Sequence, residues 1–151
     1  MAECKNIMVY VETAEGNPVK VGLEMLSPAK KLADKVTAVV IGGGVAYAAK
    51  EVAKAGADQV ICVDSEDYKE FNLDAYAQVL VELVKEENPE AVFVGGTQDG
   101  KDIAPVVAAK CNTGCASDVL DIKAEDGEVI YTCPLYGGTV LEDVKIKTTP
   151  Q

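Results

Sequence analysis

The sequence predicts an α/β fold, a three-layer sandwich in which a mostly parallel sheet lies between helices, with antiparallel strands added at the C-terminal end. Three observations support this prediction. Before Gly114, short apolar runs typical of buried strands alternate with segments of helical periodicity. Glycine-rich turns follow the second and the fourth of these runs. After Gly114 the pattern changes to short β-rich runs around Asp126-Gly127, a strong hairpin signal.

The alternating part of the chain should supply the parallel sheet, with right-handed crossovers between its strands. Buried strands are expected at residues 7–11, 37–41, 59–63 and 91–94. The intervening helices carry apolar stripes formed by Val21, Met25, Ala29 and Leu32, then by Ala46, Ala49, Val52 and Ala53, and then by Tyr76, Val79, Leu80, Leu83 and Val84. Pro28 should either kink the first helix or start it anew at Ser27, and Asn72 or Asp74 can cap the third.

The turn after strand 91–94 is where we expect a site, because open α/β folds bind ligands at the carboxyl ends of their strands. Asp102 is the expected N-cap of the next helix, with Pro105 in its first turn and an apolar stripe from Ile103, Val106 and Val107. Three glycines should let the backbone turn sharply and adopt positive φ: Gly95, Gly96 and Gly100.

Polar side chains surround the backbone N–H groups of this turn. Thr97, Gln98 and Lys101 lie beside a helix start, which normally favours an anion. Asp99 and Asp102 oppose an anion with their own charge, and Lys101 alone does not offset both. Neither glycine-rich turn has the dinucleotide fingerprint or a P-loop ending. We therefore expect contact with a ligand held mainly by a partner, and no tight phosphate site in the isolated chain.

The C-terminal third should form antiparallel strands. Residues 117–122 and 129–132 flank the hairpin signal, residues 134–138 break the second run, and residues 139–147 alternate as a last strand with one wet face. Tyr136, beside two glycines, is interpreted as part of a turn packing onto the sheet, with a stacking platform as the alternative.

The composition excludes several classes of function. The net charge of -11 opposes binding to nucleic acid or anionic lipid, and all 14 positive residues are lysine. With no histidine, the chain lacks Ser-His and Cys-His nucleophile pairs and histidine metal sites. No apolar run is long enough for membrane insertion and the N-terminus does not resemble a signal peptide, so we expect a cytoplasmic protein.

The cysteines number 5, which favours reduced thiols in a chain with no secretory signal. The spacing of Cys111 and Cys115 suggests metal binding, but no second pair or histidine completes a set of ligands. We interpret both as small buried hydrophobic residues that bind no metal.

Five segments together resemble one family: AVVIG at residues 38–42, GADQV at 56–60, VGGTQDGKDIAP at 94–105, TGCASD at 113–118 and PLYGG at 134–138. Their order is similar to that in the N-terminal domain of the electron transfer flavoprotein alpha subunit. The likeness covers nearly the whole chain. Lys101 stands where the family usually has arginine, so this position would offer a point charge in place of a planar, bidentate group.

The resemblance implies a Rossmann-like fold of the adenine nucleotide alpha hydrolase-like type. It also implies that residues 1–151 form one α/β domain of a longer subunit, whose C-terminal FAD-binding domain is not included. Such a domain would be an electron carrier's scaffold and not itself an enzyme. It would pair with the beta subunit, and the heterodimer would carry FAD that this domain does not hold alone.

The same resemblance implies that electrons come from an acyl-CoA dehydrogenase or another flavin dehydrogenase, or from NADH in bifurcating members. The residues expected near the flavin or the subunit interface are Gly95, Gly96, Thr97, Gln98, Lys101 and Tyr136. No catalytic residue is expected.

Two other classes of protein fit the same pattern of elements. A stand-alone protein of the universal stress type would share the sheet and bind ATP or AMP unaided, but the residues that grip phosphate are missing. A small α/β enzyme could work through Cys111 or Cys115, although only lysines and helix ends are available to lower the pKa of a thiol.

Overall fold

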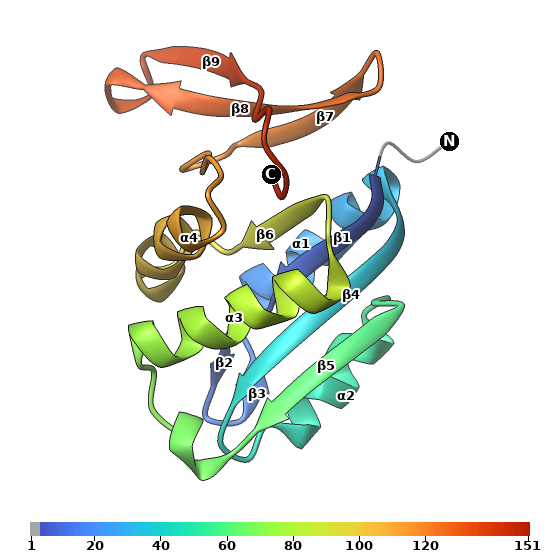
Figure 1. Ribbon diagram of the computed structural model, residues 1–151, viewed down its shortest axis with the longest axis vertical. Coiled ribbons are helices and arrows are strands. Elements are labelled where there is room, and N and C mark those ends of the chain that lie inside the picture. Colours follow the sequence, from blue (N-terminus) through green and yellow to red (C-terminus); the bar gives the residue numbers. More distant parts are fainter. Residues whose placement is uncertain (1–3) are drawn as a thin grey trace.

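A parallel sheet of 4 strands in the order β5-β4-β1-β6 forms the centre of the molecule (Figure 1). The structure is a computed structural model and describes residues 4–151. The strands of this sheet are β1 (Cys4–Tyr10), β4 (Ala33–Gly42), β5 (Gln59–Asp64) and β6 (Ala91–Val94). The expected parallel pairing is confirmed, since β1 pairs in parallel with both β4 and β6, and β4 pairs in parallel with β5.

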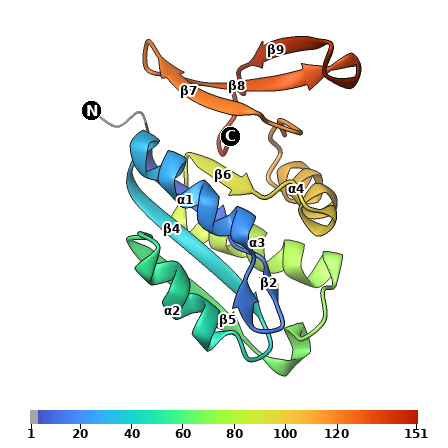
Figure 2. The same cartoon turned by 180° about the vertical axis from the view of Figure 1, so that it is seen from behind.

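Helices cover both faces of the sheet, as the sequence predicts (Figures 1 and 2). The first pair, α1 (Lys20–Leu32) and α2 (Ala46–Lys54), lies on one face. The second pair, α3 (Leu73–Glu87) and α4 (Gln98–Lys110), lies on the other. The short elements between them are β2 (Thr13–Ala14), β3 (Asn17–Pro18) and the 3-10 helix η1 (Glu66–Tyr68).

The strand β1 shows why this sequence builds a three-layer structure. Its side chains alternate between the two faces, so that Ile7 and Val9 join the core under α1 and α2, while Met8 and Tyr10 join the core under α3 and α4. All four side chains are buried. A continuous apolar run therefore supplies both cores at once, as expected of a strand covered on both sides.

Helix α1 continues through Pro28, so the second of the two expected alternatives, a new helix start at Ser27, was wrong. Leu26 and Ala29, on either side of the proline, are fully buried, and their packing against the sheet holds the helix together. The buried face consists of Gly22, Leu26, Ala29 and Leu32. Val21 and Met25, expected in the apolar stripe, are only partly buried because they lie to one side of that face.

The C-terminal strands form a separate antiparallel sheet of 3 strands in the order β7-β8-β9. They are β7 (Asp121–Glu125), β8 (Glu128–Leu135) and β9 (Val140–Val144), with the 3-10 helix η2 (Tyr136–Gly138) between the last two. Asp126 and Gly127 both have positive φ, so the hairpin signal is confirmed. The second run is broken within residues 134–138 as predicted, but β8 continues through Pro134 to Leu135 by pairing with β9, so the break comes only at η2.

This outer sheet is attached to the main core through β8. Val129, Tyr131 and Cys133 occupy alternate positions on one face of β8 and are buried with the side chains of β1, β4 and α1.

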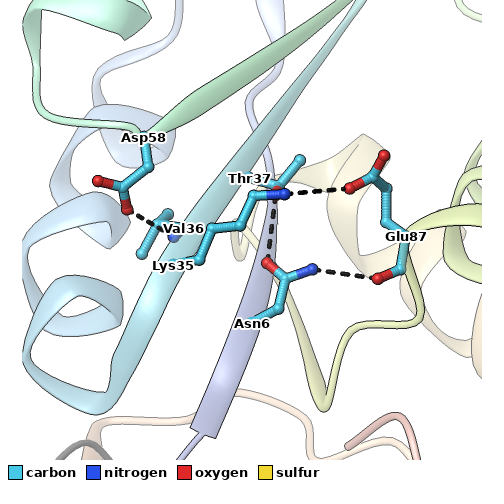
Figure 3. A network of polar contacts seen from close by, with 6 residues as sticks. All are labelled: Asn6, Lys35, Val36, Thr37, Asp58 and Glu87. Carbon is cyan, nitrogen blue, oxygen red and sulfur yellow. Dashed lines mark hydrogen bonds and ion pairs between the residues drawn. The ribbon is translucent and has the colours of Figure 1, made fainter.

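Polar groups hold the amino-terminal end of the central sheet in place (Figure 3). Thr37, which is fully buried, donates a hydrogen bond of 3.2 Å to the side chain of Asn6, which in turn donates to the backbone carbonyl of Glu87 at 3.3 Å. The carboxylate of Asp58 accepts a hydrogen bond from the backbone N–H of Val36 at 2.8 Å. These contacts tie β1, β4 and the end of α3 together at the edge opposite the expected site.

Candidate functional site

The candidate site lies where the carboxyl ends of β1 and β6 meet the start of α4. The two strands are neighbours in the sheet, with Tyr10 opposite Val94. The chain continues from them into Glu12 on one side and into the turn of residues 95–97 on the other. The predicted location of the turn at the carboxyl edge of the sheet is thus confirmed.

Thr97 is the N-cap of α4, and the prediction that Asp102 caps this helix was wrong. The backbone of Thr97 is extended, and its hydroxyl accepts a hydrogen bond of 3.0 Å from the N–H of Gly100. The same hydroxyl donates to the carboxylate of Glu12. Because the helix begins at Gln98, Asp102 lies inside it, and Pro105 lies in its middle and not in its first turn.

Close approach of the backbone, and not positive φ, explains the need for glycine at position 100 of this turn. Gly95, Gly96 and Gly100 do not have positive φ, which corrects the expectation. A Cβ on Gly100 would lie 1.9 Å from the carbonyl oxygen of Gly95 and 3.1 Å from Oε1 of Glu12. A Cβ on Gly96 would meet no atom within 4 Å. Gly100 alone of these three therefore allows the backbone to fold back tightly against the end of β6.

Acidic groups gather at this edge of the sheet. Burial raises the pKa of the half-buried Glu12, the charge of Asp99 raises it further, and the hydrogen bond from Thr97 opposes both effects. Burial also raises the pKa values of Tyr10 and Tyr76, with a further increase from Asp99 in each case. This edge of the sheet therefore carries negative charge and is partly shielded from solvent. Both properties disfavour the binding of a phosphate by this chain alone.

Replacing Glu12 with glutamine is expected to stabilise the protein at neutral pH. The raised pKa of Glu12 means that the folded state binds a proton more readily than the unfolded state, so stability falls as pH rises from the unfolded pKa through the folded one. Glutamine removes this cost and can still accept from Thr97. Urea unfolding should show Glu12→Gln more stable than wild type at pH 7, with the difference vanishing below about pH 4. Glu70→Gln, at an exposed position, is the control, and an equal gain there would contradict the explanation.

Lys101 forms an ion pair with Asp118, with Nζ and the carboxylate oxygen 2.9 Å apart. Both side chains are more than half exposed, so the pair contributes at most about 1 kcal/mol. It joins the start of α4 to the segment 113–118. Gln98 is exposed in the first turn of α4, and no hydrogen bond of its side chain is found within residues 4–151.

Tyr136 lies apart from the other expected site residues. It belongs to η2, at the end of the outer sheet, and its side chain is 84% exposed, so it does not pack onto the sheet as expected. Exposed apolar side chains surround it along the chain: Leu135, Val140 and Leu141. The structure thus brings Gly95, Gly96, Thr97, Gln98 and Lys101 together and leaves Tyr136 on a second exposed surface.

The first glycine-rich turn, at residues 42–44, is held by a carboxylate at the end of the neighbouring strand β5. The backbone N–H of Gly44 donates a hydrogen bond of 2.7 Å to the carboxylate of Asp64. This turn is therefore a strand-to-helix connection between β4 and α2, and its backbone N–H at Gly44 is already paired.

Cys111 and Cys115 are less buried than predicted. Cys111 is partly buried and Cys115 is exposed, because both lie beyond the packed part of α4. Burial of the sulfur raises the pKa of each thiol, while Lys85 opposes the effect at Cys111 and Ser117 opposes it at Cys115. A raised pKa reduces the thiolate fraction, which disfavours the thiol-enzyme alternative. Within residues 4–151 we find no cluster of side chains suited to holding a metal ion.

Comparison with known proteins identifies the family. Residues 7–151 match the Electron transfer flavoprotein domain. The chain belongs to the electron transfer flavoprotein family. This match covers nearly every described residue, including the carboxyl ends of both strands and the helix start that build the candidate site.

Curated relatives agree with this assignment. The chain is 38% identical over 142 residues to an electron transfer flavoprotein subunit alpha of Syntrophomonas wolfei, covering 94% of the chain and 45% of that relative. It is 36% identical over 150 residues to the protein FixB of Clostridium saccharobutylicum, with 95% and 45% covered. It is 38% identical over 168 residues to an acryloyl-CoA reductase electron transfer subunit beta of Anaerotignum propionicum, with 93% and 46% covered.

These matches confirm the resemblance to the electron transfer flavoprotein alpha subunit and do not favour the universal stress alternative. The chain spans about half the length of these relatives. Across residues 4–151, no helix has both the length and the apolar character needed to cross a bilayer.

Glu12 was not among the residues expected at the site. The signal was present, because Glu12 follows the first strand almost directly and the carboxyl ends of neighbouring parallel strands meet at one edge.

Proposed function

We propose that this chain is the scaffold domain of an electron transfer flavoprotein alpha subunit, part of a longer polypeptide that pairs with a beta subunit. FAD is carried by the assembled heterodimer, and electrons reach it from an acyl-CoA dehydrogenase or another flavin dehydrogenase. The flavin supplies the redox chemistry, and protein groups set its position and potential.

The observation that carries this proposal is that side chains of this chain already occupy the carboxyl edge of the sheet. Thr97 and Glu12 bond to each other at the helix start, and Asp99 adds a second carboxylate. An edge that already holds its own negative groups is a poor site for the pyrophosphate of a dinucleotide. Gln98 is exposed at its rim, and Lys101 is more than half exposed there beside its partner Asp118, so both can contact a flavin held elsewhere.

Co-purification tests the assignment. The full-length gene, expressed with its neighbouring genes, should yield a complex of two subunits with a bound flavin. The 151-residue chain, titrated calorimetrically with FAD and with AMP, should bind neither tightly. Tight binding of AMP by this chain alone would favour the stand-alone nucleotide-binding alternative and contradict the scaffold role.

Replacing Lys101 with alanine should make the flavin of the assembled complex harder to reduce. A nearby positive charge stabilises the reduced, more negative flavin, and an exposed charge contributes up to about 1 kcal/mol, which corresponds to roughly 20 mV for a two-electron couple. We therefore expect a midpoint potential more negative by on the order of 10 mV, and a smaller change for Gln98→Ala.

Lys110→Ala is the matched control, since Lys110 is exposed at the opposite end of the same helix. Lys101→Arg should keep the wild-type potential, because it keeps the charge. Equal potentials for Lys101→Ala and Lys110→Ala would remove Lys101 from the surroundings of the flavin.

A further inference from the structure

The outer edge of β6 is already partly paired. β6 is the last strand on its side of the central sheet. The N–H of Gln151 donates a hydrogen bond of 2.8 Å to the carbonyl of Glu90, and the N–H of Val92 donates one of 2.8 Å to the carbonyl of Gln151. One residue bonded in this way to two residues that flank Ala91 is the pattern of a parallel pair. Figure 1 shows the C-terminus beside the start of β6.

Beyond Gln151 the same edge faces an open groove. Alternation along the strand directs the backbone groups of Val94 to the same side as those of Val92. The groove has a volume of about 780 Å³. On the side of the central sheet its walls come from β6 and from the helices α1 and α4, and they include Val21, Met25, Val94, Ala104, Val107 and Ala108. On the other side it is lined by residues 113–122 and by side chains of the outer sheet.

Two buried polar atoms in the lining of this groove are unsatisfied. The hydroxyl of Tyr131 and Oε1 of Gln151 have no hydrogen-bond partner within residues 4–151. The Tyr131 side chain is only 4% exposed. Buried polar groups are nearly always paired in folded proteins, so both atoms indicate that a further partner belongs here.

We propose that this groove receives a fifth strand of the central sheet, formed by the residues that follow Gln151 in the longer subunit. The inference rests on the proposed function, in which the chain is part of such a subunit. The strand runs parallel to β6, because Gln151 already pairs in that direction. It is apolar on both faces, because helices of both layers wall the groove. Its backbone satisfies the remaining edge of β6, as in other cases of strand addition.

Thiol labelling tests this proposal with side chains that the chain already has. Cys111 lines the groove, while Cys62 is exposed on β5, at the opposite edge of the same sheet. Iodoacetamide labelling at about pH 9, followed peptide by peptide with mass spectrometry, would be compared between the 151-residue chain and the full-length subunit. Cys111 should react at least about 10-fold more slowly in the full-length subunit, and Cys62 at an unchanged rate.

Two outcomes would overturn the proposal. If Cys111 reacts equally fast in both proteins, the groove stays open in the subunit. If Cys111 becomes protected only when the beta subunit is added, the occupant comes from the partner and not from the same chain. Flavin content and co-purification are measured on the same samples, so that a flavin-loaded heterodimer with a reactive Cys111 contradicts the fifth strand while leaving the proposed function intact.

Amide hydrogen exchange provides a second measurement, which decides the matter if Cys111 already reacts slowly in the 151-residue chain. The Val94 N–H should exchange more slowly in the full-length subunit by at least about 10-fold. Equal exchange of Val94 in both proteins would exclude a strand on this edge.

Discussion

Replacing Gly100 with alanine is expected to lower the free energy of unfolding by about 4 kcal/mol or more, at the top of the range for single substitutions. The new Cβ would lie 1.9 Å from the carbonyl oxygen of Gly95, a distance that no relaxation of a side chain can relieve. The first turn of α4 must therefore move away from β6. Because Thr97 caps that turn through the N–H of Gly100, the cap is lost as well. Urea unfolding followed by circular dichroism measures the change.

Gly96→Ala is the matched control for this prediction. A Cβ there meets no atom within 4 Å, and the backbone of Gly96 does not have positive φ. The free energy of unfolding should change by no more than about 0.5 kcal/mol. If both variants unfold at the same urea concentration as wild type, the tight approach of α4 to β6 is not present in solution.

Replacing Ile103 with alanine is expected to cost about 2–5 kcal/mol. Ile103 is fully buried in the core between α3, α4 and the sheet, so truncation removes apolar contacts and leaves a cavity. The residue also lies less than two turns from Thr97, and loss of its packing should loosen the start of α4. Chemical denaturation gives the stability.

Val106→Ala, on the same helix, tests whether the loss of stability depends on burial and not only on the truncation of an apolar side chain. Val106 is only partly buried, so this truncation should cost about 1 kcal/mol or less. Equal losses for the two variants would contradict the placement of Ile103 in the core. Ile103→Val should fall between them, at about 0.5–1.5 kcal/mol.

The central sheet could be predicted from the sequence because its strands are apolar on both faces. The run at residues 91–94, followed by glycines and a polar helix start, has few alternatives, and β6 has the expected bounds. The hairpin at Asp126-Gly127 was equally clear, since its two residues adopt the positive φ that this turn requires.

The start of α4 was harder to predict because several residues in a row could cap it. Thr97, Asp99 and Asp102 all have suitable side chains, and Pro105 made a late start attractive. What decides between them is the bond from Thr97 to Glu12, a residue 85 positions away in the chain. Such long-range contacts are set by packing and leave no periodic signal in the sequence. The same holds for the ion pair of Lys101 with Asp118.

The burial of Val129, Tyr131 and Cys133 in the main core makes the outer hairpins one cooperative unit with the central sheet. Detaching them would expose those three side chains together, so this layer cannot melt independently as an appended module would. The tip of the outer sheet at η2, between β8 and β9, is not held by burial in this core, since Tyr136 is 84% exposed. Insertions or a changed sequence at that tip would therefore be tolerated by folding, and selection there can act on recognition alone.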